Sequence, residues 1–115
     1  MKLLLDKGST SQILDVFIQD SFSYSGLTGL SCSSASLSCY YHRNTAVSAT
    51  AITLVDMTVG TYISGGFMQI DSTNLPGFYQ LCVPNAAFQT GADSFSLLLK
   101  GAASMAPCPL EIQLK

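Results

Sequence analysis

The sequence predicts an all-β domain whose strands pack in two layers. Short apolar runs rich in β-branched and aromatic residues recur along the chain, and clusters of Gly, Pro, Asn and Ser separate them. This spacing is typical of sandwiches and barrels, and no run has the length expected of an ordinary helix. With 115 residues, the chain has the size of one domain with one modest core.

Seven segments alternate between apolar and polar residues as half-buried strands do. In the first of them, Leu14, Val16 and Ile18 point to one face and Asp15 points to the other, because successive side chains of a strand project to opposite sides. The predicted strands cover residues 13–19, 37–43, 51–59, 67–71, 78–83, 95–100 and 110–114.

The sixth predicted strand should supply the centre of the core. Phe95, Leu97 and Leu99 alternate with serines, so all three should point inward. A loop is expected at residues 21–38, because this stretch contains eight serines and two glycines.

Two connections carry clear local signals. The pair Pro76-Gly77 predicts a type II turn, because proline presets φ and glycine accepts the left-handed conformation. Residues 84–91 predict one short helical connector, in which Asn85 would cap the free N–H groups and Gly91 would close the other end.

Seven strands and one short helical connector predict an immunoglobulin-like β-sandwich, and a small Greek-key barrel is the alternative. Pro107 and Pro109 stand beside the last predicted strand. Because proline donates no ladder hydrogen bond, we expect this strand at a sheet edge.

Residues 1–10 lack alternation and are predicted to form an N-terminal arm, with residues 11–115 as the single β-sandwich domain. Leu3, Leu4 and Leu5 are consecutive, so at least one must face away from any sheet that the others pack against. We expect these leucines to contact a neighbouring subunit. The alternative is a first strand of the same domain.

Composition and charge argue against several classes of function. The net charge is −2 and the five basic residues are scattered, so no basic stripe could neutralise nucleic-acid phosphates. No apolar stretch is long enough to span a membrane or to form the apolar part of a signal peptide. Only 10% of the residues are charged, which predicts a neutral, hydroxyl-rich surface suited to protein partners.

The sequence shows no catalytic or metal-binding motif. One lone histidine, His42, accompanies four cysteines that form no C-x-x-C pair, so a usual zinc set is incomplete. No serine lies in a G-x-S-x-G motif. We therefore expect no enzyme activity and no cofactor, with four free thiols preferred to a disulfide. The cysteines are Cys32, Cys39, Cys82 and Cys108.

A polar and aromatic run is the second candidate protein interface. Its residues are Tyr40, Tyr41, His42 and Arg43. Tyr and Arg are enriched at interface cores because they combine large buried area with a hydrogen-bonding tip. The two tyrosines should face opposite ways, so only one of them can lie in the core.

Three stretches of the chain together resemble small immunoglobulin-like proteins of bacteriophage virions. They are residues 71–81, which contain Pro76-Gly77-Phe78-Tyr79, residues 83–87, which read Val83-Pro84-Asn85-Ala86-Ala87, and residues 97–101. Such virion proteins serve as capsid cement or decoration proteins and as baseplate modules. The chain departs from antibody-type domains because it has no Trp, and because Cys82 follows Tyr79 by three residues where those domains have a spacing of two. This departure argues against the antibody-type inter-sheet disulfide.

The resemblance implies a non-enzymatic structural protein of the virion, assembled in the host cytoplasm. We expect a capsid cement or decoration protein that oligomerises and binds the major capsid protein, with no nucleic-acid or membrane partner. The alternatives are a tail or baseplate adaptor and a β-sandwich that binds a ligand or the host surface.

Overall fold

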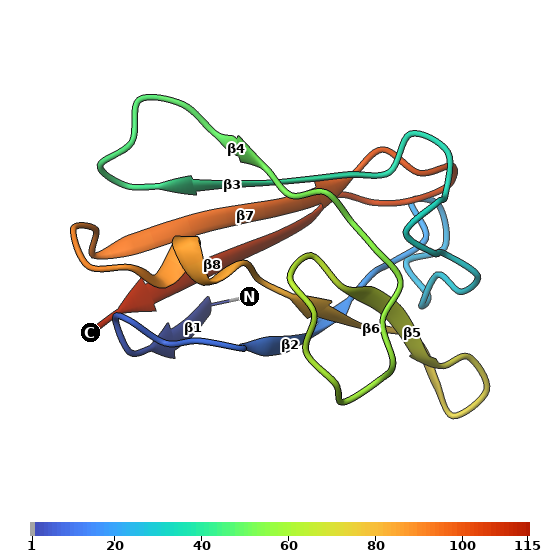
Figure 1. Cartoon of the computed structure of the whole chain (residues 1–115). Coiled ribbons are helices and arrows are strands. Elements are labelled where there is room, and N and C mark those ends of the chain that lie inside the picture. The colour runs from blue at the N-terminus through green and yellow to red at the C-terminus, as the bar shows by residue number, and fades with distance from the viewer. Residues whose placement is uncertain (1) are drawn as a thin grey trace.

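The computed structural model describes residues 2–115 as two β-sheets that pack face to face (Figure 1). The larger sheet has the order β1-β8-β7-β3-β4 and the smaller one the order β2-β6-β5. The strands are β1 Lys2–Leu5, β2 Ile13–Phe17, β3 Ser38–Arg43, β4 Thr50–Ala51, β5 Phe67–Asp71, β6 Leu75–Cys82, β7 Ser94–Lys100 and β8 Cys108–Leu114. The prediction of an all-β, two-layer domain is confirmed.

The core lies between the sheets and is built by the alternation that the sequence displays. Leu14, Val16 and Ile18 are buried on the inner face of the smaller sheet. Phe95 and Leu97 are buried on the inner face of the larger one, together with Leu99. The predicted inward faces of the first and sixth predicted strands are confirmed.

Tyr79 ties the long β2–β3 loop to this core. Its ring stacks on Phe67 at a centroid distance of 5.0 Å. Its hydroxyl donates to the Leu27 carbonyl at 2.7 Å and accepts a bond from the Leu30 N–H at 3.2 Å. Both hydrogen-bonding functions of a fully buried tyrosine are thus satisfied, and the serine-rich loop gains fixed anchor points.

The predicted strand at 51–59 is wrong beyond its first residue. Only Thr50–Ala51 pair with β3, and the chain then leaves the larger sheet to reach β5 in the smaller one (Figure 1). Val55 forms an isolated bridge with Gly66. The apolar residues of this crossing segment cover the outer side of the smaller sheet. There Met57 packs against Cys82, with 3.6 Å between the sulfur atoms.

The predicted N-terminal arm is also wrong for Lys2–Leu5. These residues form β1, which pairs in parallel with β8 of the same chain. Leu3 and Leu5 pack against the core, whereas Leu4 stays 59% exposed. The alternative of a first strand in the same domain is the one that the structure supports, because the edge of β8 offers main-chain partners within the chain itself.

The prediction that the last strand lies at a sheet edge is wrong, because β8 lies between β1 and β7. At Pro109 itself, however, β8 has no paired strand among the described residues on the side that the proline nitrogen faces. The N–H of Leu114 donates to Asp93 before β7, and the N–H of Lys115 donates to Leu5 of β1. Alternate residues of β8 therefore bond to opposite neighbours. The nitrogen of Pro109 faces the β1 side, where the described part of β1 begins opposite Glu111, so within residues 2–115 the missing donor of Pro109 meets no strand.

The helical connector is shorter than predicted, and its cap differs. A 3₁₀-helix covers Asn85–Phe88, with Pro84 at the cap position and no side-chain cap. The Asn85 side chain instead accepts hydrogen bonds from the Ser11 N–H and the Tyr62 hydroxyl. Gly77 has the predicted positive φ, at 93°, but it lies inside β6, and the turn itself is at residues 72–74.

Alkaline pH is expected to destabilise the fold through a core thiol. Burial, with a smaller effect of nearby Cys108, raises the pKa of Cys39 from 9.0 to about 12. The folded state keeps a proton that the unfolded chain releases above pH 9. The free energy of unfolding should therefore fall as pH rises from about 9 towards 12, by at most about 1.4 kcal/mol per pH unit for this group.

Urea denaturation at several pH values in this window measures the slope. Cys39→Val removes the titrating group and should flatten the slope by the contribution of one thiol. An unchanged slope in the variant would assign the alkaline loss to other groups.

Candidate protein-binding surface

The outer face of the larger sheet gathers residues from both predicted interface segments. In register, Lys2 of β1 lies beside Glu111 of β8, Glu111 beside Ser96 of β7, and Ser96 beside His42 of β3. These four side chains form one row across the sheet, because paired residues on neighbouring strands project to the same face.

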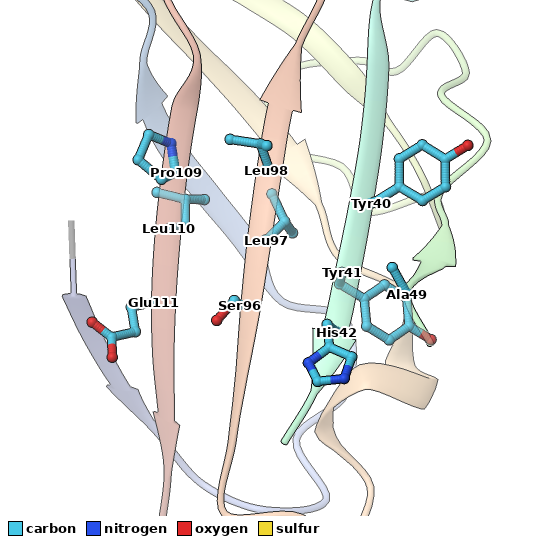
Figure 2. A pocket seen from close by; sticks show the side chains of 10 residues that line it. All are labelled: Tyr40, Tyr41, His42, Ala49, Ser96, Leu97, Leu98, Pro109, Leu110 and Glu111. Atoms are coloured by element: carbon cyan, nitrogen blue, oxygen red, sulfur yellow. The ribbon is translucent and has the colours of Figure 1, made fainter. Parts of the chain in front are cut away.

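A second, more apolar row runs beside the first. Pro109 pairs with Leu98, and Leu98 pairs with Tyr40, which pairs with Ala51 of β4. Tyr40 is 45% exposed. Together the two rows border a groove of about 550 Å³, which Figure 2 shows across β8, β7 and β3. The outer face therefore combines one charged and polar row with one aromatic and aliphatic row.

Tyr41 points the other way, as the alternation predicts. It is buried and its ring makes an edge contact with Phe95 at a centroid distance of 6.1 Å. Of the two adjacent tyrosines, Tyr40 alone presents its ring on the outer face, and Tyr41 belongs to the core.

His42 is positioned by the loop that follows β3. Its Nε2 lies 2.8 Å from the carbonyl oxygen of Ala46. A carbonyl can only accept, so Nε2 is the donor in this contact. The His42 ring lies at the lower border of the groove in Figure 2.

Arg43 is used within the fold. Its guanidinium donates to the Gln89 and Thr90 carbonyls in the loop after the 3₁₀-helix, at 3.1 Å for Thr90. It pairs with Phe95 in register, so it is not on the face that carries Tyr40 and His42. Of the seven predicted interface residues, the structure brings Leu4, Tyr40 and His42 to one face and leaves Leu3, Leu5, Tyr41 and Arg43 on the inner side.

The row also places a serine between a histidine and a carboxylate, which the sequence did not reveal. In the described residues no hydrogen bond joins Ser96 to His42 or Glu111. A nucleophilic serine needs a hydrogen-bonded base, and this arrangement does not supply one.

Other chemical groups of the described chain are dispersed. No group of three or more His, Cys, Asp or Glu within residues 2–115 could hold a metal ion. Cys32 donates to Asp56 at 3.1 Å, and this carboxylate raises the pKa of the Cys32 thiol. Within the same range, no helix is long and apolar enough to cross a membrane.

The surface is completed by four residues that were not predicted as interface residues, Ser96, Leu98, Pro109 and Glu111. Alternation with buried neighbours predicts that Ser96 and Glu111 face outward, but the sequence does not say which strands lie side by side. Comparisons of the chain with protein-family models, with curated proteins and with solved structures found no match.

Proposed function

We propose that the chain is a non-enzymatic, immunoglobulin-like binding module that acts as a structural protein of a bacteriophage particle, as a cement or decoration protein on the capsid. The observation that carries the binding role is the uncovered outer face of the larger sheet, where Tyr40, Leu98 and Pro109 lie in one row. Exposed aromatic and aliphatic side chains grouped around a groove are typical of protein-binding surfaces.

The order of the strands supports the immunoglobulin-like topology. In variable-type sandwiches the fourth strand added to the G-F-C sheet lies beside C, and the opposite sheet contains B-E-D. Here the orders β8-β7-β3-β4 and β2-β6-β5 correspond to G-F-C-C′ and B-E-D when the strands are taken in chain order. The chain differs in that β1 joins the larger sheet, beside β8.

The phage assignment rests on the resemblance of residues 71–87 and 97–101 to virion proteins. The low charge of the surface agrees with it, because only 10% of residues are charged and a weakly charged surface repels identical neighbours little. We propose the major capsid protein as partner, with assembly in the host cytoplasm.

The copy number in purified particles tests this proposal. Quantitative mass spectrometry of particles of the phage that encodes the chain should find it at a copy number near that of the major capsid protein. A few tens of copies per particle would instead indicate a tail or baseplate adaptor. Absence from the particles would overturn the virion role and favour the ligand-binding alternative, for which the groove volume lies in the usual range.

The binding surface is tested by Tyr40→Ala. A central exposed tyrosine in a desolvated contact contributes about 2 kcal/mol, which corresponds to a roughly 30-fold weaker binding to particles that lack the protein. Tyr24→Ala is the matched control, because Tyr24 is also exposed, on the β2–β3 loop. Equal binding by both variants would exclude the outer face of the larger sheet as the contact.

A further inference from the structure

The free edge of β1 carries unpaired main-chain groups. The Leu5 carbonyl accepts a bond from the Lys115 N–H at 3.0 Å, and the Lys7 N–H donates to the Lys115 carbonyl at 2.9 Å. Along a parallel strand, alternate residues bond to the same neighbour. Leu3, Leu5 and Lys7 therefore direct their main-chain groups towards β8, and Lys2 and Leu4 direct theirs away from the molecule. The Asp6 carbonyl accepts bonds from the Ser9 N–H and the Ser9 hydroxyl within a turn, so at Asp6 only the N–H belongs to the free edge.

The other sheet edges of the described chain are protected in the ways that proteins commonly use. The edge strand β4 has two residues. The start of β5 is covered, because its Phe67 N–H donates to Val55 at 2.9 Å. At the centre of β2 lies exposed Asp15, and pairing of two copies about this residue would place like charges face to face. The edge of β1 has neither a proline nor a bulge.

The sequence of β1 and the next residue is complementary to itself in the antiparallel direction. Lys2-Leu3-Leu4-Leu5-Asp6 has a basic residue at one end, an acidic residue at the other and three leucines between them. If two copies pair about a two-fold axis at Leu4, Leu4 lies opposite Leu4 and Leu3 lies opposite Leu5. Each Lys2 then lies opposite Asp6 of the other copy, which is a favourable cross-strand pair.

We propose that a second copy of this chain binds at the free edge of β1, so that the two larger sheets join into one continuous sheet across a two-fold axis. The register uses the outward N–H and C=O groups of Leu4, the Lys2 carbonyl and the Asp6 N–H. The Leu4 N–H donates to the Leu4 carbonyl of the other copy, in both directions. The Asp6 N–H donates to the Lys2 carbonyl of the other copy, again twice. This arrangement is isologous, as two-fold contacts must be.

The same contact accounts for the exposed leucine. Leu4 is 59% exposed in the single chain, and Leu3 and Leu5 are only partly covered at the sheet edge. In the pair, each leucine gains an apolar neighbour across the new ladder. The contact is short and would bury less area than a standard interface, so the dimer should be weak and reversible.

This inference names a partner for the proposed binding module and in that sense rests on the proposed function. Its test uses pure protein and no phage particle, so the self-association and the proposed virion function can fail separately. Sedimentation velocity from about 1 µM to about 1 mM should show a monomer–dimer equilibrium. Leu4→Pro removes two intermolecular donors but no β1–β8 bond, and should weaken the dimer at least about 10-fold.

Charge variants test the register, and Asp6→Lys also removes the exposed 3.8 Å pair of Asp6 with Lys115 of the same chain. Lys2→Glu places Glu against Asp6 of the other copy, and Asp6→Lys places Lys against Lys2, so each variant alone should weaken self-association by about 3- to 10-fold. An equimolar mixture of the two variants restores both opposite-charge pairs and should dimerise as the original chain does. Lys100→Glu makes the same charge change as Lys2→Glu at an exposed site on β7 and should have no effect.

Three results would overturn the inference. One is a monomer at every concentration. Another is a dimer that Leu4→Pro leaves unchanged although the variant is folded by circular dichroism. The third is a mixture of Lys2→Glu and Asp6→Lys that dimerises no better than either variant alone, because the pairing of Lys2 with Asp6 is specific to this register.

Discussion

Phe95→Ala is expected to lower the free energy of unfolding by about 3–5 kcal/mol, as truncation of a buried phenylalanine does. The Phe95 ring is 1% exposed. It makes edge contacts with Phe88 at 5.2 Å and with Tyr41 at 6.1 Å between ring centroids. It thereby joins β7, β3 and the 3₁₀-helix, and no neighbouring strand can move in to fill the space without breaking a ladder.

Chemical denaturation followed by circular dichroism measures this loss. Phe22→Ala is the matched control, because the Phe22 side chain is 87% exposed and its truncation should change the free energy of unfolding by no more than about 0.5 kcal/mol. A loss below about 1 kcal/mol for Phe95→Ala would place this ring outside the core and would contradict the assignment of β7.

Gly26→Ala is expected to destabilise the fold by about 3 kcal/mol through a clash between two backbones. A Cβ atom at Gly26 would lie 2.0 Å from the Pro76 carbonyl oxygen and 2.9 Å from the Gly77 nitrogen. Conversely, a Cβ at Gly77 would lie 2.6 Å from the Gly26 Cα. The β2–β3 loop therefore reaches β6 only because both positions are glycine, and neither backbone can move without breaking its hydrogen bonds.

Gly29→Ala in the same loop is the control for this clash. Gly29 has a φ of 86°, and a Cβ there would meet no atom within 4 Å, so only the backbone strain of an alanine at positive φ remains, at roughly 1 kcal/mol. Thermal and urea denaturation of the two variants should separate the cost of the backbone clash from the cost of the positive φ. If both cost the same, the close approach of the loop to β6 contributes nothing beyond conformational strain.

Some of the fold follows from the sequence because the alternation of apolar and polar residues is local. The alternation in the runs around Val16 and Leu97 identified the inner faces of β2 and β7, and the alternation of Tyr40 with Tyr41 separated the exposed ring from the buried one. The positive φ of Gly77 was also predictable, because only glycine accepts that conformation without strain.

The partners of each strand were decided only by the tertiary structure. A period of two residues says which face of a strand is buried. The main-chain groups that pair strands are the same in every residue, so they do not specify which strand becomes the neighbour. Thus the sequence could not place Lys2–Leu5 beside β8, more than a hundred residues away. Nor could it show that His42 and Glu111 flank Ser96. The residue type of Arg43 predicts an interface role, whereas packing gives its guanidinium two carbonyl acceptors within the fold.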